Sequence, residues 1–142
     1  SYTTAAGDFA VTRHITSETG DLTGRRLVGN SGTPTAVAQA SAGVGATPTA
    51  GNPPQPVGHN FGGTCYLVTA GAPVAGNQLL VTFAGSPLAT APVSVTLTPI
   101  DALAAANQGQ FAVGGVANTA FVITAFAAPA IGAHTWHYEV IF

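Results

Sequence analysis

The chain ends in AHTWHYEVIF (133–142), a stretch in which two kinds of side chain alternate. Successive side chains of a β-strand point to opposite faces, so a period of two is typical of a strand with one buried face. The stretch therefore predicts a final strand whose aromatic face closes the core, formed by His134, Trp136, Tyr138, Val140 and Phe142. The opposite face is predicted to lie at a subunit contact and consists of His137, Glu139 and Ile141.

The two histidines of this stretch suggest a competing hypothesis, a metal site. His134 and His137 would share one face of a helix, but on a strand they point to opposite sides. One strand therefore cannot bring both to one ion, and a ring of symmetry-related histidines about a threefold axis remains as the alternative. Cys65 and His59 have no spacing typical of a thiolate–imidazole pair, so we predict that Cys65 is a buried, inert thiol.

Carboxylates suited to catalysis are scarce. Hydrolysis of a glycosidic bond normally needs two carboxylates on either side of it, whereas only Asp101 and Glu139 remain after residue 26. They fall on different predicted elements, and no G-x-S-x-G nucleophile motif occurs. The sequence therefore predicts no enzyme, no catalytic residue, no metal ligand and no cofactor.

The period of two continues upstream of the final strand. Five further short strands are predicted, separated by Gly, Pro or Asn: CYLVTAG (65–71), QLLVTFAG (78–85), APVSVTLTP (91–99), QFAVGGV (110–116) and NTAFVITAFA (118–127). In APVSVTLTP the residues predicted to face inward are Val93, Val95 and Leu97. This spacing predicts an all-β fold, an antiparallel β-sandwich or jelly-roll-like domain.

Two segments depart from this pattern. IDALAAANQG (100–109) predicts one short helix at 101–107, capped by Asp101 and ended by Gly109. Residues 29–63 are rich in Gly, Pro, Ala and Ser, and predict long extended loops with short strands in TAVAQA (35–40) and GVGATPT (43–49). Pro53, Pro54 and Pro56 argue against regular structure between them and the next strand.

Charge divides the chain in two. Charged residues are 6% of the sequence, and six of the eight lie in the first 26: Asp8, Arg13, Glu18, Asp21, Arg25 and Arg26. We therefore predict an N-terminal arm at 1–26 and a β-sandwich domain at 27–142. FAVTRHIT (9–16) partly alternates and could add as a strand to another chain, although a solvated terminus is the alternative.

The low charge also bears on partners. Three Arg and no Lys cannot neutralise many phosphates, so nucleic acid is not predicted as a partner. No run of about 18 apolar residues occurs, and we therefore predict no membrane span. A net charge of −2 gives little repulsion between copies, which favours self-assembly, although a monomer solubilised by its 19 Thr residues remains the alternative.

Four motifs follow one another in the second half of the chain: VSVTLTP (93–99), the Ala-rich AAAN (104–107), FVIT (121–124) and the terminal W-x-Y-x-V at Trp136, Tyr138 and Val140. With these motifs, the sequence from about Asn30 to Phe142 resembles the C-terminal β-module common in virion proteins of tailed bacteriophages, in head-decoration, head-fibre and tail-fibre proteins. This resemblance implies a non-enzymatic structural protein that acts as a homotrimer.

Only about 26 residues precede this module, which fits a capsid decoration or cement protein better than a long fibre. The expected partners are further copies of the chain and the major capsid protein of the same virion. The expected location is the outer surface of the virion head, less so the tail, after synthesis in the host bacterial cytoplasm. The candidate capsid contacts lie in the arm: Phe9, Val11, Arg13, Arg25 and Arg26.

A tail-fibre or spike tip that binds host surface glycans remains the alternative function. In that case exposed aromatic side chains such as Tyr66 or Trp136 would stack on a sugar ring. A tryptophan in an alternating strand belongs more often to the core, which favours the decoration protein.

Overall fold

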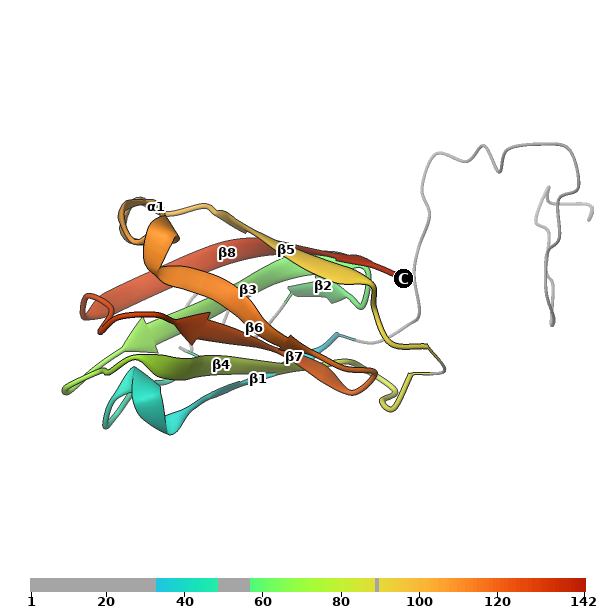
Figure 1. Ribbon diagram of the computed structural model, residues 1–142, viewed down its shortest axis with the longest axis horizontal. Helices are drawn as coiled ribbons and strands as arrows, with labels where there is room; N and C mark the ends of the chain where they lie inside the picture. Colours follow the sequence, from blue (N-terminus) through green and yellow to red (C-terminus); the bar gives the residue numbers. More distant parts are fainter. Residues whose placement is uncertain (1–32, 49–56, 89) are drawn as a thin grey trace, which may run out of the picture.

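The computed structural model describes residues 33–48, 57–88 and 90–142, and two antiparallel sheets of four strands pack face to face in it (Figure 1). Sheet A has the order β1 (Thr35–Ala38), β4 (Gly76–Thr82), β7 (Ala120–Ala125), β6 (Phe111–Val116). Sheet B has the order β2 (Val57–His59), β3 (Gly62–Thr69), β8 (Gly132–Ile141), β5 (Ser94–Pro99). The predicted all-β sandwich is confirmed.

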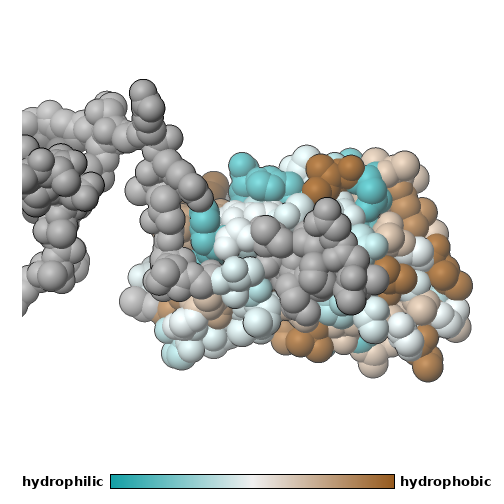
Figure 2. Space-filling model, turned by 180° about the vertical axis from the view of Figure 1, so that it is seen from behind, coloured by the Kyte–Doolittle hydropathy of each residue, from teal (hydrophilic) through white to brown (hydrophobic). Residues whose placement is uncertain are grey.

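The strands run along the long axis of the molecule, so the sandwich has two ends. At the end that we call proximal, Thr35 pairs with Thr82 and the ring of Phe83 lies 6.4 Å from that of Phe142. The distal end carries α1 and the loop from β7 to β8, at the left in Figure 1. Hydrophobic residues gather at this end in the view from behind, where it lies at the right (Figure 2).

β8 is the longest strand and lies between β3 and β5 in sheet B. Trp136 pairs with Cys65 of β3, and Tyr138 pairs with Leu97 of β5. The even-numbered side chains from His134 to Val140 are buried, as the alternation predicted. Phe142 was predicted to join them but is exposed, because it lies beyond the last residue of the strand.

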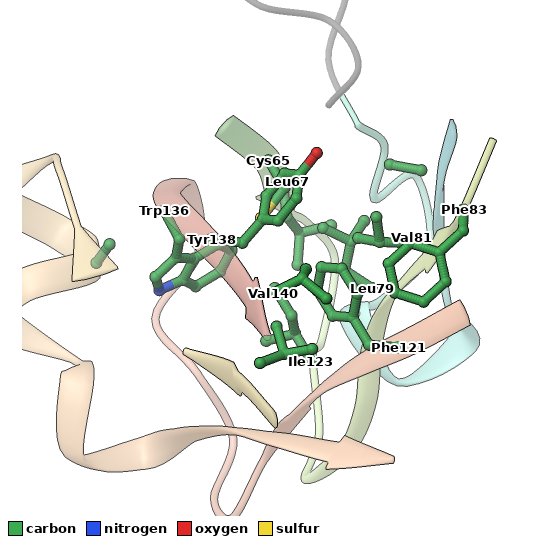
Figure 3. Close-up of a cluster of buried hydrophobic side chains, with 14 residues drawn as sticks. Cys65, Leu67, Leu79, Val81, Phe83, Phe121, Ile123, Trp136, Tyr138 and Val140 are labelled. Atoms are coloured by element: carbon green, nitrogen blue, oxygen red, sulfur yellow. The ribbon is translucent and has the colours of Figure 1, made fainter. Parts of the chain in front are cut away.

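The core lies between the two sheets (Figure 3). Sheet A contributes the buried side chains Leu79, Val81, Phe121 and Ile123, together with Phe83, which follows β4 directly. Sheet B contributes Cys65, Leu67, Trp136, Tyr138 and Val140. The rings of Phe121 and Tyr138 meet across the sheets with centroids 5.4 Å apart. Full burial of one large apolar side chain contributes about 1.5–3 kcal/mol, so this cluster holds the sandwich together.

The short helix predicted at 101–107 is confirmed as α1 (Ala102–Ala106). Asp101 caps it as expected, since its Oδ1 accepts a hydrogen bond from the backbone N–H of Ala104. The last residue of the helix is Ala106, one before the predicted end, and Asn107 is its C-cap, with a side chain that donates to the carbonyl of Leu103. A 3₁₀ turn, η2 (Gln108–Gln110), then leads into β6, and a second one, η1 (Ala40–Ala42), follows β1.

Three predictions on strands need correction. Val93 was predicted to face inward but is 78% exposed, because it precedes β5 at the proximal end of the sandwich. Of the strand predicted at 43–49, the described residues 43–48 form only one bridge, between Thr47 and Val68, since Gly43 and Gly45 adopt positive φ. The sequence also missed β2, which begins directly after Pro56.

Candidate interaction surfaces

The predicted contact face of β8 lies on the outer surface of sheet B. His137, Glu139 and Ile141 are all exposed, and the His137 Nε2 lies 4.0 Å from the Glu139 Oε1. Across the strands, Glu139 has Gly62 on one side and Thr96 on the other. The orientation of these residues agrees with the alternation, and their role at a subunit interface stays a prediction.

His134 lies on the other face of β8 and is part of the core. Its Nε2 lies 3.0 Å from the carbonyl oxygen of Ala130, and its Nδ1 has no hydrogen-bond partner. The ring packs against Phe111 and Trp136 with centroids 5.1 and 5.7 Å away. Burial lowers the pKa of this imidazole below its usual value, which favours the neutral form.

The metal hypothesis gains no support from the described residues. His134 and His137 do point to opposite faces of sheet B, as expected for neighbours three apart on a strand. In the part of the chain that the structure describes, no group of three His, Cys, Asp or Glu side chains could hold an ion. Each of these two histidines has neighbours that account for it without a metal.

Cys65 is fully buried on the inner face of β3. Burial raises the pKa of its thiol to about 12, so the thiol stays protonated at neutral pH and cannot act as a nucleophile. His59, the partner considered for it, accepts a hydrogen bond at Nδ1 from the backbone N–H of Phe61. The predicted inert thiol is therefore the state that the environment of Cys65 favours.

The sequence missed an apolar surface at the proximal end, which we call the proximal patch: Phe61, Val93 and Phe142. All three side chains are exposed. The Val93 N–H donates to the Ile141 carbonyl at 2.7 Å, and the rings of Phe61 and Phe142 meet at 5.4 Å. A patch of large apolar side chains on an ordered surface is typical of a contact with another chain.

A second apolar surface lies at the distal end, in the loops that follow β1, β3 and β7 (Figure 2). Its exposed side chains are Val44, Val74, Phe126 and Ile131. The loops are tied to each other through the Val74 N–H, which donates to the Ser41 carbonyl, and through the Thr69 hydroxyl, which donates to the Ala130 carbonyl. Both ends of the sandwich thus expose apolar side chains on segments that hydrogen bonds tie to the rest of the domain.

A cleft of about 260 Å³ opens between the edge strands β5 and β6. Its walls include Val95, Leu97, Phe111, Val113 and Trp136. None of its lining residues is charged or a usual metal ligand. Trp136 is only 1% exposed there and offers no open ring face, so the cleft lacks the stacking platform that a sugar would need.

Of the other predicted site residues, Tyr66 is half-buried on the outer side of β3. Phe9, Val11, Arg13, Arg25 and Arg26 lie outside the described residues, and so does the proposed boundary between residues 26 and 27. Within the described ranges, no helix has both the length and the apolar character to cross a membrane.

Comparison of the chain with protein-family models, curated proteins and solved structures finds no match. The surfaces above must therefore be interpreted from their own chemistry.

Proposed function

We propose that this protein is a non-enzymatic structural component of a bacteriophage virion, and that it acts as a homotrimeric capsid decoration protein. The proposal starts from the resemblance of residues 30–142 to the β-module of phage virion proteins. The two-sheet sandwich agrees with the fold that this resemblance implies. In this role, further copies of the chain and the major capsid protein are the partners.

One observation supports the proposal most directly, the combination of very low charge with apolar surfaces at both ends. The described residues include only two carboxylates, Asp101 and Glu139, and no Lys or Arg. Buried protein interfaces are depleted of charged residues and enriched in aromatic ones. A sandwich that exposes Phe61 and Phe142 at one end and Phe126 at the other is suited to contact neighbours at both ends.

The structural roles of the reactive side chains also agree with a non-enzymatic protein. Cys65 fills the core, Asp101 caps α1, and His134 packs between aromatic rings. The tail-tip alternative needs an exposed aromatic face for stacking on a glycan. Of the two residues considered for this role, Trp136 is buried and Tyr66 is half-buried on the outer side of β3.

The number of copies in purified virions tests this function. A decoration protein should be present in hundreds of copies on the head and should run as a trimer in light scattering. Gel quantification against the major capsid protein, together with imaging of labelled particles, measures both number and place. A few copies confined to the tail would overturn the decoration role, and a monomeric mass would overturn the trimer.

A further inference from the structure

Strand β5 forms one edge of sheet B, with β8 on its inner side in the strand order (Figure 1). Its sequence, SVTLTP, contains no charged residue, and its register with β8 is continuous. Edge strands are normally kept from pairing with other chains by charge, proline, a bulge or short length. In β5 the one such feature is Pro99 at the last position, so most of this edge is able to add a strand.

The other sheet edges among the described residues are better protected. β1 and β2 are four and three residues long. β6 has the same length as β5, but its register shifts between Val113 and Gly115, and it contains two glycines. Short length and an irregular register both disfavour the addition of a strand. β5 is therefore the edge best suited to it.

The backbone groups of β5 alternate in direction. The Ile100 N–H donates to the Thr135 carbonyl at 2.9 Å, in the same register as the β5–β8 ladder. Hydrogen-bonded and non-hydrogen-bonded pairs alternate along an antiparallel ladder, so the even-numbered residues of β5 bond to β8. The N–H and C=O groups of Val95 and Leu97 then point to the open side. Among the described residues, no backbone group on that side bonds to them.

We propose that β5 pairs with β5 of a second copy of the chain, antiparallel about a twofold axis at Thr96. Val95 of each copy then lies opposite Leu97 of the other copy. Each of these pairs exchanges two hydrogen bonds, as hydrogen-bonded pairs of an antiparallel ladder do. The two B sheets become one continuous sheet, in which neither β5 is an edge.

The register follows from the donors at the two ends of β5. A shift of two residues one way would place Leu97 opposite Val93, whose N–H is already bonded to the last residue of β8. The opposite shift would place Val95 opposite Pro99, which has no N–H. Either shift leaves one carbonyl of each β5 without a donor. The pairing centred on Thr96 satisfies both groups of Val95 and of Leu97.

The side chains of β5 suit this contact. On the outer face, Thr96 lies opposite its own copy and Thr98 lies opposite Ser94, and hydroxyl side chains paired across strands stabilise a sheet. On the inner face, Leu97 lies beside Val95 of the second copy. Both residues line the cleft between β5 and β6, so the second copy shields part of this cleft from water.

Charge does not oppose the contact. Glu139 is the exposed carboxylate beside β5, where it pairs with Thr96. It lies three strand spacings, or about 14 Å, from Glu139 of the second copy. This separation exceeds the screening length of about 8 Å at physiological ionic strength, so the two carboxylates repel each other weakly.

The inference goes beyond the proposed virion role and does not rest on it. A twofold contact uses the same surface on both copies, whereas a closed ring of three uses two different surfaces. A monomer would therefore become a dimer through β5, and a trimer would join a second trimer. The pairing adds a link between assemblies to the contacts that build them.

Disulfide cross-linking of the full chain tests the proposal. Thr96→Cys places two thiols on a non-hydrogen-bonded pair, whose Cα atoms lie about 4.5 Å apart, within the range of a disulfide. Thr98→Cys is the matched control on the same exposed face, because its two thiols would belong to Cα atoms more than about 13 Å apart. The native Cys65 is fully buried and should not take part.

We expect oxidised glutathione to link two copies of Thr96→Cys at least about tenfold faster than two copies of Thr98→Cys. Free thiols are blocked before denaturation, and a gel without reductant then measures the linked pair. Thermal unfolding checks that both variants keep the fold.

Light scattering over a range of protein concentrations provides a second measurement. The mass of the unmodified protein should double as its concentration rises, from a monomer or from a trimer. Thr96→Lys sets two ammonium groups opposite each other and should raise the dissociation constant of this step by about tenfold or more. Thr98→Lys adds the same charge opposite Ser94 of the other copy and should raise it by less than about threefold.

Equal rates of cross-linking for Thr96→Cys and Thr98→Cys would overturn the proposal. A mass that is the same for the unmodified protein and Thr96→Lys at every concentration would overturn it as well. These outcomes are distinct from a failure of the virion role. A trimer that never doubles contradicts the β5 pairing alone, and a monomer that doubles to a dimer contradicts the trimer alone.

Discussion

The imidazole of His134 lies parallel to the indole of Trp136, with ring planes 8° apart and centroids 5.7 Å apart. Both rings occupy the inner face of β8 and are withdrawn from water. The His134 Nε2–H donates to the Ala130 carbonyl, which leaves Nδ1 as an acceptor without a partner. The core therefore accommodates a neutral histidine and disfavours a charged one.

Acid should destabilise the fold through His134. Burial lowers its pKa in the folded state, whereas the unfolded chain has the usual value near 6.5. The stabilisation is complete above that value and is lost as the pH falls toward the lower folded pKa, because the unfolded state binds the proton first. The free energy of unfolding should therefore decrease as the pH falls from about 7.5 to about 5.

Urea denaturation at several pH values measures this effect, and His134→Phe provides the control. The variant keeps an aromatic ring beside Trp136 but cannot take up a proton. Its stability curve should be flatter over the same range, although its absolute stability should drop with the loss of the hydrogen bond to Ala130. An unchanged slope in the variant would assign the pH dependence to other groups.

The Cys65 thiol should be unreactive in the folded protein. Its pKa of about 12 leaves almost no thiolate at about pH 8, and its side chain is fully buried between the sheets. A thiol-specific disulfide reagent should therefore react only at the rate of unfolding, and within seconds in denaturant. Rapid labelling under native conditions would contradict this placement of β3.

Asp101 should stabilise the domain as a helix cap. Asp101→Ala removes the acceptor for the Ala104 N–H and should lower the free energy of unfolding by about 1 kcal/mol. Asp101→Asn retains an oxygen at that position and should cost less. Denaturation of the two variants side by side separates the loss of the cap from the loss of the charge.

Two adjacent glycines of β6 should respond differently to the same substitution. A Cβ at Gly114 would lie 2.8 Å from the Cβ of Thr124 and closer still to its hydroxyl, whereas a Cβ at Gly115 would meet nothing within 4 Å. Gly114→Ala should therefore destabilise the protein by about 1–3 kcal/mol, as overpacking does. Gly115→Ala should be close to neutral, and equal melting temperatures of the two variants would contradict the register shift in this strand.

Thr124→Ala provides a second check on this pair. It removes the hydroxyl that donates to Asn77 on the exposed surface, which alone should cost little. Combined with Gly114→Ala, it should recover part of the lost stability, because the closest contact disappears.

Alternation made most of the strands and the inner face of β8 predictable. Each predicted stretch from residue 64 onward overlaps an observed strand, and Trp136 and Tyr138 are buried as expected. A period of two depends only on the geometry of the single strand, so it is visible without knowledge of the partner strands. The cap at Asp101 was predictable for the same reason, since its hydrogen bond spans three residues.

The formation of β2 was not predictable in this way. β2 is three residues long, and it exists because Val57 and His59 pair with β3 along its edge. The same local sequence without that edge would be an ordinary loop after a proline. Gly43 and Gly45 show the opposite case, in which an alternating sequence does not form a strand. Their positive φ values interrupt the extended backbone.

The sequence by itself determined the all-β class, the division into inner and outer faces and the buried state of Cys65, because these follow from local periodicity and polarity. Only the tertiary structure decided which side chains near the ends of the strands are left exposed by the opposite sheet. Val93 and Phe142 alternate like core residues, yet both are exposed, because Val93 precedes β5 and Phe142 follows β8 at the proximal end of the sandwich. A side chain is buried only where a second surface covers it, and the sequence of one strand does not show where that second surface ends.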